Sequence, residues 1–219
     1  MRWIISYYGT TIGKKVFMAV TGLCLFGFVL VHMIGNLQVY AGQARLDAYA
    51  AFLAHNEKLL WVARLALLLL VALHIIAAVQ VWWRNRGARP VEYRGKADLG
   101  IDYAARTMVW SGPIIAAFVL YHLFHFTWGT VHPSYIVGAV YHNVVTGFQV
   151  PWVAAFYIIA NFLLAVHLYH GLWSWFQTLG LEHPRYNALR RVFAVGLSVL
   201  IGIGNISIPL SVLTGLVRE

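Results

Sequence analysis

Long apolar segments recur along this chain and constrain its fold more than any other feature of the sequence. A helix needs about 20 apolar residues to cross a hydrocarbon core about 30 Å thick. We therefore expect five membrane-spanning helices, at residues 16–40, 59–83, 107–128, 150–176 and 192–217. The chain is 61% hydrophobic and only 11% charged, and this composition excludes a soluble two-domain protein. The predicted fold class is an all-α integral membrane protein, a single transmembrane domain over residues 1–219.

Lysine and arginine are distributed unevenly between the two sides of this predicted bundle. Five spans place the two chain ends on opposite sides, and twelve basic residues then fall on the N-terminal side against four on the other. The positive-inside rule puts the N-terminus in the cytoplasm and the C-terminus outside. The twelve are Arg2, Lys14, Lys15, Arg84, Arg86, Arg89, Arg94, Lys96, Arg106, Arg185, Arg190 and Arg191. This topology explains the net charge of +9 better than nucleic-acid binding does.

Cysteine and carboxylate placement narrows the possible chemistry. Cys24 is the only cysteine, which excludes disulfides, an iron–sulfur cluster ligated by cysteines of this chain, and covalently attached haem. All seven carboxylates lie outside the predicted spans or at their ends. A proton-driven pump or cation transporter usually needs a buried acid near the midplane, so this class is disfavoured.

Histidine is the titratable residue that the predicted spans do contain. His32 lies in the first, His74 in the second, His122 and His125 in the third, and His167 and His170 in the fourth. An intramembrane histidine is costly unless it is paired or binds a ligand. Hydrogen-bonded histidines that only pack helices together remain the alternative.

The depths of these histidines group them in pairs. At 1.5 Å per residue, His32 and His122 both lie about 25 Å from the cytoplasmic side, whereas His74 and His167 lie about 13 Å from it. Two histidine pairs at two depths match two haem b groups, each with one imidazole from each of two helices. A simple metal site would gather three or four ligands at one depth. We therefore expect the five helices to enclose two stacked haems.

Small residues lie on the same helices as three of the four paired histidines. Gly27 and Gly35 flank His32, Gly112 precedes His122, and Gly171 follows His167 by one turn. Such residues let a porphyrin approach the backbone, and they serve helix packing equally well.

Several strings resemble the cytochrome b membrane anchor of succinate:quinone oxidoreductases, in its single-subunit, five-helix, two-haem form. They are "HMIGN" at 32–36, "FVLYH" ending at His122, "HLYHGLWSWFQTLGL" at 167–181 and "GKKVFMAVTGLCLFGFVLVHMIGNL" in the first span. The resemblance implies axial ligands at His74 and His167 for an inner haem and at His32 and His122 for an outer one. His125 and His170 are then neighbours that hydrogen-bond or pack against the ligands, or alternative ligands.

The resemblance also implies the partners and the reaction. A flavoprotein subunit would oxidise succinate with FAD, and an iron–sulfur subunit would pass the electrons to this anchor at the cytoplasmic face of a bacterial inner membrane. The catalytic site would then lie on a partner subunit. The acceptor we expect is menaquinone, and fumarate reduction is the same reaction in reverse. Assembly into a higher oligomer is left open.

Charged and polar residues near the ends of the spans are candidates for binding haem propionates or quinone. For propionates we consider Arg64, which alternatively reaches to the outer interface, and also Lys14, Lys15 and Arg84, which alternatively bind a peripheral subunit or lipid. The quinone candidates are Asn36, Gln38, Glu57 and Lys58 at the outer end, and Ser6, Lys14 and Trp83 at the inner end. The remaining histidines, His55, His132, His142 and His183, are expected to be solvated or interfacial.

Two rival functions remain. One is a cytochrome b anchor of a fumarate reductase or of another quinone-linked dehydrogenase or hydrogenase. The other, from a different class, is a haem-free structural anchor or transporter.

Overall fold

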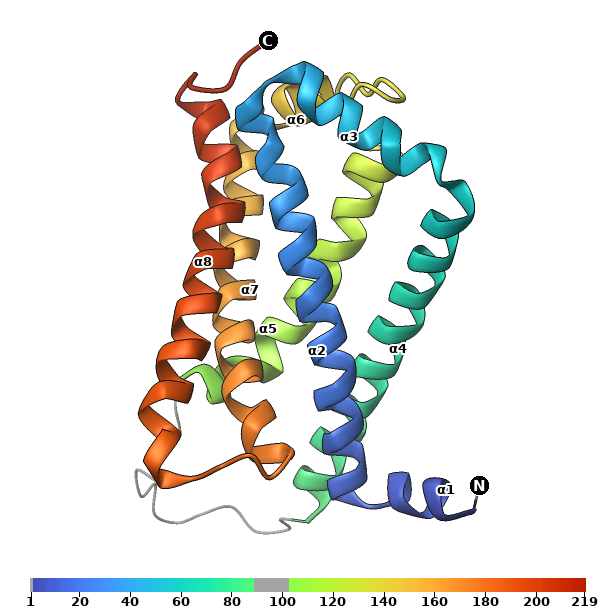
Figure 1. Ribbon diagram of the computed structural model, residues 1–219, viewed down its shortest axis with the longest axis vertical. Helices are drawn as coiled ribbons and strands as arrows, with labels where there is room; N and C mark the ends of the chain where they lie inside the picture. The colour runs from blue at the N-terminus through green and yellow to red at the C-terminus, as the bar shows by residue number, and fades with distance from the viewer. Residues whose placement is uncertain (1, 89–102) are drawn as a thin grey trace.

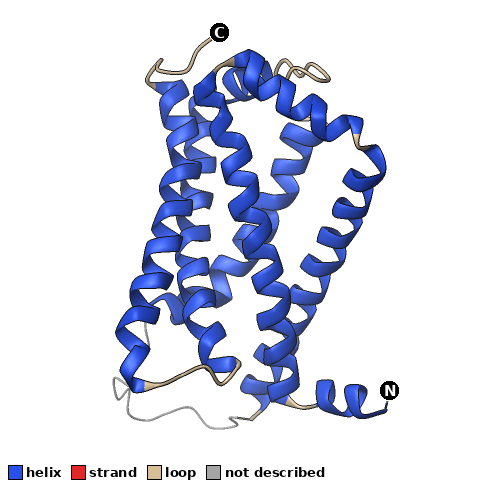
Figure 2. Cartoon of the chain, viewed as in Figure 1, coloured by secondary structure: helices blue, strands red, loops and turns tan. Residues whose placement is uncertain are grey.

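Five long helices dominate the structure, and they correspond to the five apolar segments. The computed structural model of the chain describes residues 2–88 and 103–219, and all the regular structure in that part is helical (Figures 1 and 2). The long helices are α2 (Thr11–Asn36), α4 (Glu57–Gly87), α5 (Tyr103–His122), α7 (Pro151–Thr178) and α8 (Asn187–Leu213). Each has the length and hydropathy needed to cross a membrane. The expected five-helix all-α membrane architecture is confirmed at this level.

Short helices lie at the two ends of the bundle (Figure 1). At the end where the chain begins, the N-terminal end, α1 (Arg2–Gly9) and the 3-10 turn η3 (Pro184–Tyr186) precede α2 and α8. At the opposite, C-terminal end lie the 3-10 helix η1 (Leu37–Ala41), α3 (Gln43–His55), the π-helical turn η2 (Leu123–Thr127) and α6 (Val140–Phe148). Nine of the twelve basic residues expected on one side lie at the N-terminal end, and Arg89, Arg94 and Lys96 lie outside the described residues.

Three of the long helices, α2, α5 and α8, begin and end four to six residues earlier than expected. The fifth long helix, α8, shows the difference at both ends. It begins at Asn187 instead of residue 192 and ends at Leu213 instead of residue 217. Arg190 and Arg191 are its fourth and fifth residues, because a helix continues past the apolar layer wherever its backbone hydrogen bonds are made. Beyond Leu213 the chain turns back, and the amide of Val217 donates to the carbonyl of Ser211 at 3.0 Å.

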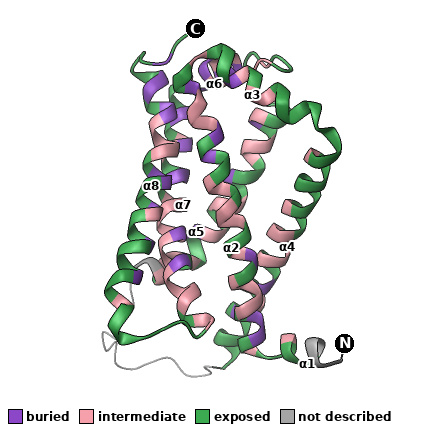
Figure 3. Cartoon of the chain, in the orientation of Figure 1, coloured by how far each residue is buried: buried purple, intermediate pink, exposed green. Residues whose placement is uncertain are grey.

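The helices do not all pack against one another. The most extensive contact joins α7 to α8, followed by α2 with α4 and α5 with α7, whereas α4 has α2 and α3 as its main neighbours. Only Ala77 and Val81 are buried along α4, and its surface is mostly exposed (Figure 3). In a bilayer this surface would face lipid, since apolar side chains gain nothing by pairing with protein instead of acyl chains.

The main hydrophobic cluster lies toward the C-terminal end. It joins η1, α3, α5, α6, α7 and α8, and its most deeply buried members are Val145, Ala154 and Ala160. Asp47 of α3 accepts a hydrogen bond from the amide of Tyr141 at 2.9 Å, which satisfies an orphan donor at the start of α6. The short helices at this end are thus tied to the bundle.

His132 belongs to the loop between η2 and α6, and its expected solvated or interfacial position is wrong. It is 9% exposed; its Nε2 donates to the carbonyl of Asn143 at 2.8 Å and its Nδ1 accepts from the amide of Ser134 at 3.1 Å. Sequence hydropathy could not show this, because the burial comes from α6 folding back over the loop. His55 and His183 are exposed as expected, and the half-buried His142 contacts the carboxylate of Glu219.

These contacts predict that the loop opens at low pH. Burial lowers the pKa of His132, the neighbouring His142 lowers it further, and the carbonyl of Asn143 raises it. A histidine whose pKa is lower in the folded state binds its proton more tightly when unfolded, so its contribution to stability is lost as the pH falls below about 6.5. Protonation also removes the lone pair that accepts from Ser134. We expect faster amide exchange over residues 129–136 at pH 5.5 than at pH 7.5, after correction for intrinsic rates.

The matched control for this experiment is His132→Gln. Glutamine keeps a donor near the position of Nε2 but does not titrate, so the acceleration at pH 5.5 should disappear. His142, which contacts Glu219, and the stacked ring of His125 also lie near His132. An acceleration that persists in His132→Gln would assign the effect to one of those groups instead.

Candidate functional site

Two histidine pairs occupy the space between the long helices. Toward the C-terminal end, His32 of α2 faces His122 of α5, with ring centroids 5.8 Å apart and ring planes at 88°. Phe28 stacks on His32 one turn earlier along α2. Toward the N-terminal end, His74 of α4 faces His167 of α7 at 6.4 Å and 65°. These are the pairs that helix depth and the resemblance predicted; their ligation of haem stays a prediction.

Each pair joins helices whose backbones are not close neighbours. The main contacts of α5 are with α7 and η2, and those of α4 are with α2 and α3. The side chains of His32 and His122, and of His74 and His167, therefore reach toward one another across an interhelical space. Histidines that only pack adjacent helices would not need a second imidazole facing them from a more distant helix.

The ring separations suit a shared metal ion. An imidazole nitrogen lies about 2 Å from a bound metal, so two imidazoles on opposite sides of one ion have ring centres about 6 Å apart. Rotation of either ring about the axis through the metal leaves this distance unchanged, so angles of 88° and 65° are both compatible. Within residues 2–88 and 103–219, no group of three or more His, Cys, Asp or Glu side chains forms a conventional metal site.

The hydrogen bonds of His74 define which ring nitrogen is available. Its Nδ1 lies 3.1 Å from the carbonyl oxygen of Met18 and 3.2 Å from the hydroxyl of Thr21, both on α2. A carbonyl only accepts, so Nδ1 carries the proton and Nε2 keeps its lone pair. Histidines that bind metals typically donate their other ring N–H in this way.

Two more of the paired histidines, His167 and His122, also have a hydroxyl near Nδ1, at a longer distance than in His74. His167 Nδ1 lies 3.4 Å from the hydroxyl of Ser111 on α5. His122 Nδ1 lies 3.4 Å from the phenol of Tyr157 on α7. In each case the contact uses Nδ1, and Nε2 has its lone pair available to a ligand when Nδ1 carries the proton and donates to the hydroxyl. Each pair thus brings together two imidazoles, the donor set that a haem with two histidine ligands would need.

His125 and His170 lie one turn beyond the paired histidines of their own helices. His125 is fully buried, and its Nδ1 lies 3.1 Å from the Tyr157 phenol. Tyr157 therefore connects His125 to His122, which agrees with a neighbouring role for His125. His170 is half-buried on α7.

Sequence reasoning missed the residues that contact the paired histidines from neighbouring helices. Thr21, Ser111 and Tyr157 all place a hydroxyl near an imidazole Nδ1. A buried hydroxyl within an apolar helix needs a partner, and this requirement was the available signal. Which partner each would find depends on the helix arrangement, which hydropathy does not specify.

The glycines divide into two groups. A Cβ at Gly27, Gly112 or Gly171 would meet nothing within 4 Å, so space lies around them. Gly35 instead packs against Tyr49, where a Cβ would come within 2.8 Å of the ring. Gly22, which the sequence did not single out, approaches His74, whose Cε1 would lie 3.1 Å from a Cβ.

The propionate candidates are spread over both ends. Arg64 is exposed on α4, with its guanidinium 5.2 Å from the Trp61 ring. Lys15 and Arg84 are exposed at the N-terminal end. Lys14 is buried there; its ammonium donates to the carbonyl of Tyr8 at 3.2 Å and lies 4.0 Å from that ring, so it fastens α1 to α2.

The quinone candidates do not gather in one cavity. Asn36 and Gln38 are half-buried near the end of α2, and Glu57 and Lys58 are exposed at the start of α4. Ser6 and Trp83 are exposed at the N-terminal end. No described contact selects among these residues.

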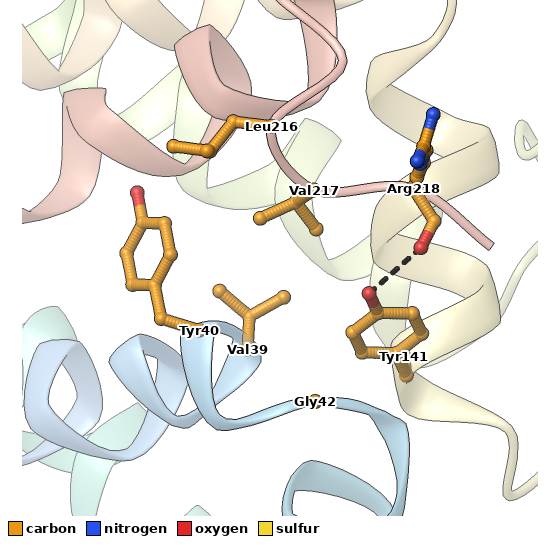
Figure 4. A pocket seen from close by; sticks show the side chains of 7 residues that line it. All are labelled: Val39, Tyr40, Gly42, Tyr141, Leu216, Val217 and Arg218. Carbon is orange, nitrogen blue, oxygen red and sulfur yellow. Dashed lines mark hydrogen bonds between the residues drawn. The ribbon is translucent and has the colours of Figure 1, made fainter.

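A separate hollow of about 270 Å³ lies at the C-terminal end (Figure 4). Val39, Tyr40 and Gly42 form one side of it and the segment Leu216–Arg218 the other, while the Tyr141 phenol donates to the carbonyl of Arg218 at 2.9 Å. Neither histidine pair lines this hollow. We assign it no part in the site.

Comparison with known proteins finds no significant match: no protein-family model, no curated protein and no solved structure matches the chain.

The contact between Gly22 and His74 predicts different outcomes for two glycine substitutions in α2. Gly27→Ala should raise the free energy of unfolding by about 0.5–1 kcal/mol, because alanine is the better helix former and the site is open. Gly22→Ala should lose that gain, because the new methyl group presses on an imidazole held by Met18 and Thr21. Denaturant-induced unfolding in detergent measures both. Equal stabilisation of the two variants would contradict the position of His74.

Proposed function

We propose that this chain is the di-haem cytochrome b anchor of a bacterial succinate:menaquinone oxidoreductase. The observation that carries the proposal is the pair of facing imidazole couples, His32 with His122 and His74 with His167, on helices that are not close neighbours. The resemblance of the strings at 13–37 and 167–181 to such anchors supports the particular enzyme. The five apolar helices supply the membrane setting.

The work of the chain in this proposal is to bind, orient and insulate. His74 and His167 present Nε2 to the inner haem, and His32 and His122 hold the outer one. Thr21, Ser111 and the Met18 carbonyl keep the ligating rings in orientation through Nδ1. A bound haem supplies reversible one-electron transfer, and the apolar helices around it exclude water.

Direction across the membrane follows from the charge distribution. The N-terminal end would be cytoplasmic because the basic residues concentrate there. A flavoprotein with FAD and an iron–sulfur subunit would dock at that face. Oxidation of one succinate to fumarate releases two electrons and two protons, and reduction of one menaquinone consumes the same number, so the overall reaction balances. The N-terminal pair, His74 and His167, would hold the haem that lies nearer this electron source.

A haem-free packing role explains the histidines less well. Packing requires only that each imidazole be hydrogen-bonded, and Nδ1 of His74 already meets that need twice. It does not explain why a second imidazole, His167, faces His74 from another helix. A cytochrome b anchor of a fumarate reductase would use the same residues and differ in physiological direction.

Haem content tests the proposal directly. The purified chain should contain two haem b per polypeptide, with an α-band in the reduced-minus-oxidised spectrum. His32→Ala or His122→Ala should remove one haem, and His74→Ala or His167→Ala should remove the other. A haem that has an imidazole ligand on one side only is held poorly. The matched control is His170→Ala, which should keep both. A chain without an α-band would overturn the proposal.

The partner assignment has its own test. Affinity purification from native membranes should recover a flavoprotein and an iron–sulfur protein with this chain, and the complex should reduce a menaquinone analogue with succinate. His74→Ala should abolish this electron transfer, whereas reduction of a soluble dye by the flavoprotein should continue. Recovery of a different dehydrogenase or a hydrogenase would reassign the complex and leave the two haems in place.

A further inference from the structure

One paired histidine differs from the others in what lies behind it. The partners of His74 are a backbone carbonyl and a threonine of the adjacent helix, and His167 contacts a serine. Behind His122 lies a phenol that itself contacts a second, fully buried imidazole. We propose that Tyr157 and His125 form a hydrogen-bonded unit that orients His122 and lowers the reduction potential of the haem between His32 and His122. This inference rests on the proposed function.

The contacts form a continuous series from one side chain to the next. His122 Nδ1 lies 3.4 Å from the Tyr157 phenol oxygen, and that oxygen lies 3.1 Å from His125 Nδ1. Tyr157 is 4% exposed and His125 is 0% exposed, so water does not compete for these groups. In such an environment each hydrogen bond polarises the next one.

Ligation of the haem through His122 Nε2 would determine the direction of every hydrogen bond. The neutral ring then carries its proton on Nδ1 and donates to the Tyr157 oxygen. The phenol is left to donate its own hydrogen to His125 Nδ1. His125 consequently keeps its proton on Nε2, the one buried imidazole nitrogen in the described part of the chain that lacks a partner.

The backbone around His125 is built to hold it in place. The π-helical turn η2 follows His122 directly and contains His125, and the amide of Trp128 donates to the carbonyl of Leu123 at 2.9 Å. Such turns insert one residue into a helix and are frequent at functional sites. An uninterrupted helix would direct His125 differently relative to His122, because a π-turn changes the angle between successive side chains.

Ring stacking and a close glycine fix the imidazole further. Tyr121 stacks on His125 at 5.5 Å and 19°, and His132 stacks on it at 4.8 Å and 28°. A Cβ at Gly147 would lie 2.9 Å from His125 Cε1, so only glycine fits there without moving the ring. A side chain held on three sides is a defined acceptor for the Tyr157 hydroxyl.

The expected effect on the haem follows from charge. When Nδ1–H donates to an acceptor, electron density at Nε2 rises and the ligand stabilises the ferric state more than the ferrous state. A phenol that donates onward to His125 is the better acceptor, since its own oxygen becomes more negative. Removal of either group should therefore raise the potential of this haem.

The test is a redox titration of both haems in the purified complex, together with the low-spin ferric signals in electron paramagnetic resonance. Tyr157→Phe should raise the midpoint potential of the His32–His122 haem and shift its ferric signal, leaving the other haem unchanged. Ser111→Ala is the reciprocal control and should affect only the His74–His167 haem. Haem bound at both sites with both potentials unchanged in Tyr157→Phe would overturn the inference.

A second pair of variants separates hydrogen bonding from packing and does not depend on the folding of Tyr157→Phe. His125→Asn keeps an acceptor near the position of Nδ1, whereas His125→Leu fills similar space without one. We expect His125→Leu to raise the potential and His125→Asn to restore it toward the parent value. Equal shifts in both would show a packing effect and overturn the inference, and a parent chain without haem would instead overturn the proposed function.

Discussion

The cost of placing an imidazole in an apolar layer governs this structure. Backbone groups are satisfied within helices, so the few polar side chains along the long segments must find partners of their own. His74 finds them on α2, His167 and His122 on helices α5 and α7, and His125 on α7. These hydrogen bonds use Nδ1 and leave Nε2 for another partner. The contacts that lower the cost of burying an imidazole therefore also prepare the ring to bind a ligand through Nε2.

The long helices that hold these imidazoles pack unevenly against one another. α7 and α8 make the most extensive contact, and the hydrophobic cluster around Val145 and Ala154 packs the start of α7 against the end of α8. α4 is held mainly through α2, with little buried surface of its own. The facing rings of His74 and His167 therefore connect α7, which packs against α8 and α5, to α4, whose main protein neighbour is α2. A group bound between them would stabilise the position of α4, because it would add contacts that the protein itself lacks.

Hydropathy and helical rise predicted the five long helices and the two histidine pairs, because both depend on properties local to one segment: apolar length, and the depth of a residue along its own helix. The burial of His132 and of Lys14 was not predicted, since each depends on a short helix folding back, α6 over one and α1 against the other. Tyr157 was missed for a similar reason. In the sequence it is one more tyrosine in an apolar segment. Its hydroxyl meets His125 only because the π-helical turn places that residue against it. Long-range contacts of this kind carry no periodic signal in a sequence.

α7 sets the spacing between the two levels of the site. Tyr157 contacts the pair toward the C-terminal end and His167 belongs to the other pair, and ten residues of continuous helix separate them, about 15 Å at the helical rise. Asn161 lies between them, buried, with its side-chain amide donating to the carbonyl of Tyr157 at 2.9 Å. Because one rigid helix holds a group at each level, the separation of the two pairs is insensitive to movement of α4. Electron transfer depends steeply on distance, so the packing of α7 against α8 would matter to the proposed electron transfer even though α8 contributes no residue to either pair.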